Sequence, residues 1–130
     1  MEQNLIKTIL IVEDDNIQLK VLTNAFVENN FQVIGAVNGQ EGLENALNAS
    51  VDVILLDRVM PIMDGITMMQ ALRKVESSDK KIPIILFTNL PVDDIAKKSI
   101  IAAGENPDYI LKSECSLGEI VQKVREKICY

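Results

Sequence analysis

The sequence predicts an α/β fold in which a parallel β-sheet is covered by helices on both faces. Short apolar runs alternate with amphipathic segments along the whole chain, and this alternation favours parallel strands joined by helical crossovers. Apolar residues make up 48% of the 130 residues, aromatic residues only 4%, and Trp is absent. The core must therefore be aliphatic, which is typical of a buried parallel sheet. No linker, low-complexity tract or repeat divides the chain, so residues 1–130 are expected to form one domain.

Five apolar runs are the predicted strands. They are short, rich in Ile, Val and Leu, and bounded by polar or turn residues. Pro83 stands near the start of the fourth run, where a missing N–H is tolerated. In chain order the predicted strands are residues 8–12, 31–37, 51–56, 82–87 and 109–111.

The segments between and after these runs have helical periodicity. Three of them begin with capping patterns, which are Asp15 with Gln18, Asn38 with Glu41, and Ser116 with Glu119. The helix before residue 76 follows a turn at 61–65, and Gly104 is expected to end the fourth helix. The stripes that run along these predicted helices are Leu19, Leu22 and Phe26; Leu43, Ala46 and Leu47; Met68, Leu72 and Val75; Val92, Ile95, Ala96, Ser99, Ile100 and Ala103; and Leu117, Ile120, Val121, Val124 and Ile128.

Charge and composition argue against several classes of protein. The formal net charge of −6 disfavours direct binding to nucleic acid, which depends on Lys and Arg. Without His, a metal ion would need oxygen ligands, and Cys115 and Cys129 match no ligand pattern and are expected to be reduced thiols. The sequence has no signal-peptide pattern and no apolar stretch of the ~18 residues that a membrane span needs, so a cytoplasmic protein is expected.

Polar residues stand where the predicted strands end. Glu13 and Asp14 follow the first strand, Asp57 the third, Thr88 the fourth and Lys112 the fifth. The carboxyl ends of parallel strands meet at one edge, which is where such sheets bind ligands. Crowding of carboxylates either raises the pKa of one of them or requires a cation, and among cations Mg²⁺ suits oxygen ligands. Taken singly, Glu13 and Asp14 could be a solvated helix start, and Asp57 could simply end a strand. Thr88 alone is more often a turn residue, and Lys112 alone a surface charge. Together these residues suit phosphoryl transfer to a carboxylate.

With these residues in place, the chain resembles the receiver domain of bacterial two-component response regulators, in particular the single-domain, chemotaxis-type receivers. The resemblance covers almost the whole length, through ILIVED at 9–14, ILLDRVMPIMDG at 54–65, FT at 87–88 and YILK at 109–112. It implies a flavodoxin-like doubly wound (βα)5 sheet of strand order 2-1-3-4-5 in a three-layer sandwich. Because the chain ends at Tyr130, shortly after the last predicted helix, no output domain is expected.

The resemblance also implies roles for individual residues. Asp57 matches the phosphoacceptor, and Glu13, Asp14 and the backbone carbonyl of Val59 match the positions that hold Mg²⁺ together with it. Thr88, with its hydroxyl, the basic Lys112 and the aromatic Tyr109 match the residues of the conformational switch.

By the same resemblance, the phosphoryl donor is a sensor histidine kinase or a histidine phosphotransfer protein. The signal then passes to a partner protein through the fourth helix, fifth strand and last helix. The protein is expected to be a monomer or weak dimer and no enzyme, apart from self-catalysed phosphotransfer and autodephosphorylation.

The sequence departs from the usual receiver pattern at four places. Ser113 follows the lysine where Pro is usual, the link to Ser116 is a residue longer, Asn89 follows Thr88, and Val59 and Leu90 supply apolar side chains beside the site.

Two alternatives remain open. A pseudo-receiver would only bind partners, although such proteins normally lack residues that are present here. A phosphatase of the haloacid-dehalogenase type would need a second Asp two residues after Asp57, where this chain has Val59.

Overall fold

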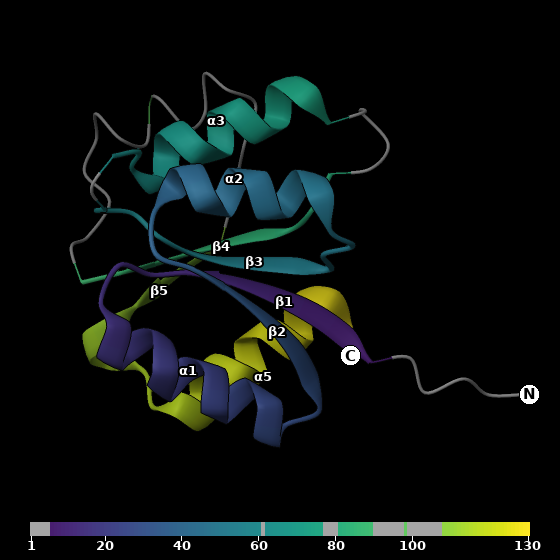
Figure 1. The fold of residues 1–130 in the computed structure, drawn as a ribbon. Coiled ribbons are helices and arrows are strands. Elements are labelled where there is room, and N and C mark those ends of the chain that lie inside the picture. Colours follow the sequence, from purple (N-terminus) through teal and green to yellow (C-terminus); the bar gives the residue numbers. More distant parts are fainter. Residues whose placement is uncertain (1–5, 61, 77–80, 90–97, 99–107) are drawn as a thin grey trace, which may run out of the picture.

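The structure is a computed structural model and describes residues 6–60, 62–76, 81–89, 98 and 108–130. Its centre is a five-stranded sheet in which every pair of neighbouring strands is parallel. Helices α2 (Gly39–Asn48) and α3 (Gly65–Val75) cover one face, and α1 (Asn16–Glu28) and α5 (Leu117–Ile128) cover the other (Figure 1). This is the predicted three-layer arrangement.

The strand order β2-β1-β3-β4-β5 confirms the predicted order 2-1-3-4-5. The strand bounds differ from the predicted ones by no more than a few residues at either end. The strands are β1 (Lys7–Val12), β2 (Phe31–Ala36), β3 (Val53–Asp57), β4 (Ile84–Thr88) and β5 (Asp108–Leu111). The order of the sheet reverses direction between β1 and β3, which is the switch point where such folds bind ligands.

Alternate residues of the central strands point to opposite faces, and each face builds its own core. In β3, Val53 and Leu55 pack with α1 and α5, whereas Ile54 and Leu56 pack with α2 and α3. All five residues of β3 are buried, Asp57 among them. β3 is therefore apolar on both faces, and its only carboxylate, Asp57, is buried at the carboxyl end of the strand.

The helix caps are largely as predicted. Asp15 accepts hydrogen bonds from the backbone of Ile17 and Gln18, Asn38 accepts from Glu41, and Ser116 and Glu119 form a reciprocal capping box. Three of the described residues in the apolar helix stripes do not pack into the core. Leu47, Val75 and Leu117 are exposed, because each lies at the end of its helix, beyond the surface that the sheet covers.

The predicted fourth helix lies outside the described residues except for Lys98, which is helical and exposed. Pro61, Leu90 and Gly104 also lie outside them. Both cysteines are free, as expected. No helix in the described ranges is long and apolar enough to cross a membrane.

Candidate functional site

The ends of β1, β3 and β4 meet at one edge of the sheet, as the strand pattern predicts. A pocket of about 340 Å³ opens there. The predicted residues that line it are Glu13, Asp14, Asp57, Val59, Thr88 and Lys112, and the neighbouring Asp15, Gln18 and Asn89 line it as well. The tertiary structure thus brings together all the predicted site residues except Tyr109.

Three of the carboxylates that line the pocket lie close together. One carboxylate oxygen from each of Glu13, Asp14 and Asp57 lies within 4.8 Å of the others. Asp14 is exposed, whereas Asp57 is buried and only 1% of Glu13 is accessible to solvent. A cluster of hard oxygen donors, partly open to water, fits the coordination that Mg²⁺ prefers.

Burial makes the charge of Glu13 costly. It raises the pKa of the Glu13 carboxyl to about 7, and the negative charge of Asp57 acts in the same direction. The hydrogen bonds from Lys112 and from the backbone of Asp15 oppose this rise in pKa. The site therefore holds more negative charge than its surroundings stabilise, and a divalent cation would relieve that excess.

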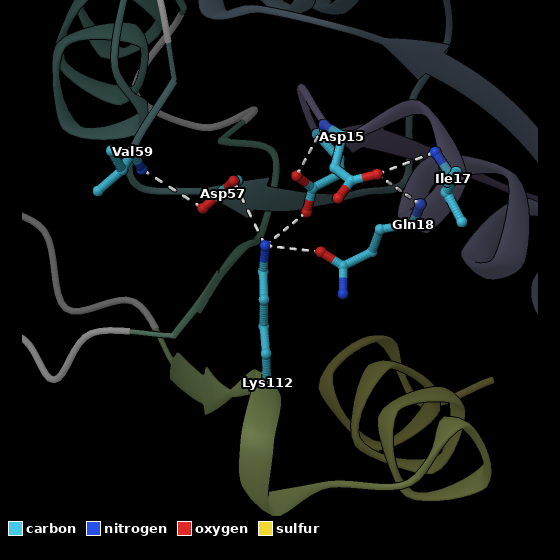
Figure 2. A network of polar contacts seen from close by, with 7 residues as sticks. Asp15, Ile17, Gln18, Asp57, Val59 and Lys112 are labelled. Atoms are coloured by element: carbon cyan, nitrogen blue, oxygen red, sulfur yellow. Dashed lines mark hydrogen bonds and ion pairs between the residues drawn. The ribbon is translucent and has the colours of Figure 1, made fainter.

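Lys112 supplies the positive charge of the pocket. Its Nζ atom lies 2.6 Å from Oε1 of Glu13, 2.8 Å from Oε1 of Gln18 and 3.4 Å from Oδ2 of Asp57 (Figure 2). It also lies 5.1 Å from the centre of the Phe87 ring. The ammonium group can donate three hydrogen bonds, and these three oxygens use all of them.

The backbone around Lys112 explains the longer link to the last helix. Lys112 does not end β5 but begins a short 3₁₀ helix, Lys112–Glu114. Ser113 lies inside this turn, and Cys115 leads to the cap of α5 at Ser116. None of the peptide bonds in the described residues is cis. The additional residue is thus accommodated by a tight helical turn.

Hydrogen bonds from backbone amides hold both ends of the loop after Asp57. The amide of Val59 donates to Oδ1 of Asp57 over 3.3 Å, and Gly65 donates to the carbonyl of Arg58 over 2.9 Å. A Cβ at Gly65 would lie 2.3 Å from the carbonyl oxygen of Asp57, so only Gly allows this approach. The side chain of Val59 is 57% exposed and stands at the rim of the pocket.

Thr88 and Tyr109 lie at different depths. Thr88 ends β4, is buried and lines the pocket. Tyr109, on β5, is an exposed side chain and is not among the described residues that line the pocket. Its register partner on β4 is Leu86, two positions before Thr88.

Gln18 is a pocket residue that the sequence analysis did not identify. It stands at the third position of α1, where a Gln normally completes a capping box. Its side chain accepts a hydrogen bond from Lys112 instead, across 94 positions of sequence. The available signal was its place in the first turn of the helix that directly follows Glu13 and Asp14.

Comparison with known proteins gives one family. The model for the response regulator receiver domain matches residues 9–125. The transcriptional regulatory protein PrrA of Mycobacterium leprae is 34% identical over 118 residues, which are 90% of this chain and 48% of PrrA. The chain thus spans about half the length of this relative. The chemotaxis protein CheY of Treponema pallidum is 31% identical over 107 residues, 80% of this chain and 71% of CheY.

A solved structure agrees with these relatives. One chain of the CheX–CheY–BeF3–Mg²⁺ complex of Borrelia burgdorferi superposes with a TM-score of 0.77 and 28% identity. The match covers 92% of this chain and 87% of that one.

Proposed function

This chain belongs to the response regulator receiver domain family of two-component signalling, and from that membership we propose that it accepts a phosphoryl group on Asp57 in a Mg²⁺-dependent reaction. The observation that carries the proposal is the placement of Asp57. Its buried carboxylate lies between two further carboxylates and the ammonium group of Lys112. An isolated strand-end Asp would need no such surroundings.

The chemistry follows from these positions. A carboxylate oxygen of Asp57 attacks phosphorus, and the bond from phosphorus to the donor breaks with its electron pair leaving on the donor. Glu13, Asp14, Asp57 and the backbone carbonyl of Val59 would hold Mg²⁺, which neutralises charge on the phosphoryl oxygens when bound. The Lys112 ammonium and the Thr88 hydroxyl stabilise the remaining negative charge.

The donor in this proposal is a phosphohistidine on a sensor kinase or a histidine phosphotransfer protein, in the cytoplasm. Beyond promoting its own phosphorylation and dephosphorylation, the chain is not an enzyme in this proposal. The output is a change of shape passed to a partner protein through the predicted fourth helix, β5 and α5. Tyr109 suits the role of reporter on that surface, because it is exposed and lies on the strand next to Thr88. No observation favours the phosphatase or the pseudo-receiver.

Phosphorylation is tested directly. The purified chain is incubated with Mg²⁺ and acetyl phosphate, and its intact mass is measured. We expect one added phosphoryl group on the wild type and on the control Asp108→Asn, which removes an exposed carboxylate from β5, and none on Asp57→Asn. Equal phosphorylation of Asp57→Asn would refute the assignment.

The switch is tested with Thr88→Ala. This variant should still take a phosphoryl group, because the nucleophile and metal ligands remain. It should lose most of the chemical-shift change around Tyr109 when beryllofluoride is added, since the hydroxyl that moves toward the phosphoryl group is gone. An unchanged shift pattern would remove Thr88 from the switch.

A further inference from the structure

The amide of Gln18 is built into the site through Lys112. Its Oε1 atom accepts a hydrogen bond from Nζ of Lys112 over 2.8 Å, and the backbone amide of the same residue donates to Oδ1 of Asp15 over 3.1 Å. The residue is half-buried at the pocket wall. Since an ammonium only donates, the oxygen of the amide must face Lys112. In Figure 2 this side chain extends from α1 toward the tip of Lys112, which reaches up from the opposite side.

The geometry of an ammonium group gives this contact a consequence. Its three N–H bonds point in tetrahedral directions, so a single acceptor leaves the group free to rotate about one bond. Glu13 and Gln18 are the two short contacts, at 2.6 and 2.8 Å. Together they determine the direction of the third N–H bond. The remaining acceptor is Oδ2 of Asp57, at 3.4 Å.

We propose that Gln18 is a positioning residue for phosphoryl transfer, which orients Lys112 so that its third N–H bond points toward the Asp57 carboxylate and can pass to an oxygen of the phosphoryl group that arrives there. The inference rests on the proposed function and adds a residue to it. Preorganised donors lower the barrier because they need no reorganisation when charge develops. Gln18 does not touch the reacting atoms, and its effect passes through Lys112.

A neutral amide suits this position better than a carboxylate. Glu13, Asp14 and Asp57 already crowd their negative charges within 4.8 Å. A carboxylate at position 18 would bind Lys112 more strongly and add repulsion at the nucleophile. Gln18 supplies an acceptor without adding charge, and so leaves the third N–H bond available to a phosphoryl oxygen.

The test uses two variants and one matched control. Gln18→Met keeps the length and helix propensity of the side chain but removes the acceptor. Gln18→Glu keeps an acceptor oxygen. Gln122→Met makes the same chemical change on α5, at an exposed residue that bonds only to the side chain of Glu126 among the described contacts. Urea denaturation checks that all three remain folded.

The first readout is the NMR signal of the Lys112 ammonium group in the unphosphorylated protein, assigned by its loss in Lys112→Gln. A merely structural role of Gln18 would leave this signal in place. We expect wild type, Gln122→Met and Gln18→Glu to show a signal protected from exchange with water, and Gln18→Met to lose it. A protected signal in Gln18→Met, or loss in Gln18→Glu, would overturn the inference.

The second readout is the rate constant for phosphorylation by acetyl phosphate. The loss of one hydrogen bond to a charged group predicts a rate about tenfold lower for Gln18→Met, and no change for Gln122→Met. If wild type reacts and Asp57→Asn does not, a wild-type rate in Gln18→Met refutes only the role of Gln18 and leaves the proposed function intact. If Asp57→Asn reacts as well as wild type, the proposed function itself fails.

Discussion

The amide nitrogen of Gly39 donates a hydrogen bond to the carbonyl oxygen of Met63 over 3.1 Å. This bond ties the first residue of α2 to the loop that follows Asp57, and therefore to the backbone that carries Val59. A Cβ atom at position 39 would lie 2.3 Å from that same oxygen. Only glycine allows the two backbones to approach so closely.

Gly39→Ala should therefore push the loop away from α2. We expect the free energy of unfolding to fall by about 2 kcal/mol, as in other overpacked sites, and Mg²⁺ to bind more weakly because the Val59 carbonyl moves. Urea denaturation and a Mg²⁺ titration measure the two effects. In Gly118→Ala, the control, the nearest heavy atom to the new Cβ, apart from its chain neighbours and the backbone of α5, is 4.0 Å away, so neither quantity should fall. Wild-type values in Gly39→Ala would show that the loop adapts.

Ile62 holds a conformation that suits few side chains. Its φ is 70°, although it is β-branched, and its side chain is 81% exposed. Ile62→Asn should raise the free energy of unfolding by about 1 kcal/mol, because Asn tolerates left-handed backbone better. Thermal or urea unfolding measures it. The control, Ile17→Asn, replaces an Ile that is 78% exposed on α1 and should not raise the free energy of unfolding. A less stable Ile62→Asn would mean that the position is not strained.

Glu119 predicts a specific pH dependence. Hydrogen bonds from the backbone and side chain of Ser116 hold the pKa of its carboxyl below the usual value of 4.5. A lowered folded pKa contributes stability above the unfolded pKa, and this contribution is lost as pH falls through the folded value. Glu119→Gln should thus be less stable than wild type at pH 7, with the difference shrinking as the pH falls below the usual value of 4.5. Unfolding curves across pH test this, and a constant difference would contradict it.

The lifetime of the proposed aspartyl phosphate should depend on Val59. The hydrophobic side chain stands at the rim of the pocket and cannot orient a water for attack on phosphorus. Val59→Asn supplies such a group and should speed phosphate loss roughly severalfold. Val75→Asn makes the same change at an exposed position at the end of α3 and should leave the rate unchanged. Equal lifetimes in all three proteins would exclude shielding by Val59. Leu90, the other residue expected to shield the site, lies outside the described residues.

The sequence by itself determined the sheet and the main residues at its edge. A short continuous apolar run bounded by polar residues is a local property of the sequence, and parallel strands must place their carboxyl ends at one edge. Glu13, Asp57 and Thr88 could therefore be predicted to meet without any knowledge of side-chain packing. The helix starts at Asp15, Asn38 and Ser116 were equally predictable, because a cap depends only on residues within one turn.

Only the tertiary structure decided which side chains in the pocket form hydrogen bonds with one another. The bonds from Lys112 to Gln18 and Glu13 join residues 94 and 99 positions apart, and no local pattern encodes which acceptor a long side chain reaches. Gln18 fits a capping box, yet the ammonium group of Lys112 is a stronger donor than the backbone amide it would otherwise meet. Leu47 and Val75 fit their helical stripes equally well, yet they are exposed, because the extent of the sheet beneath a helix sets where its buried face ends.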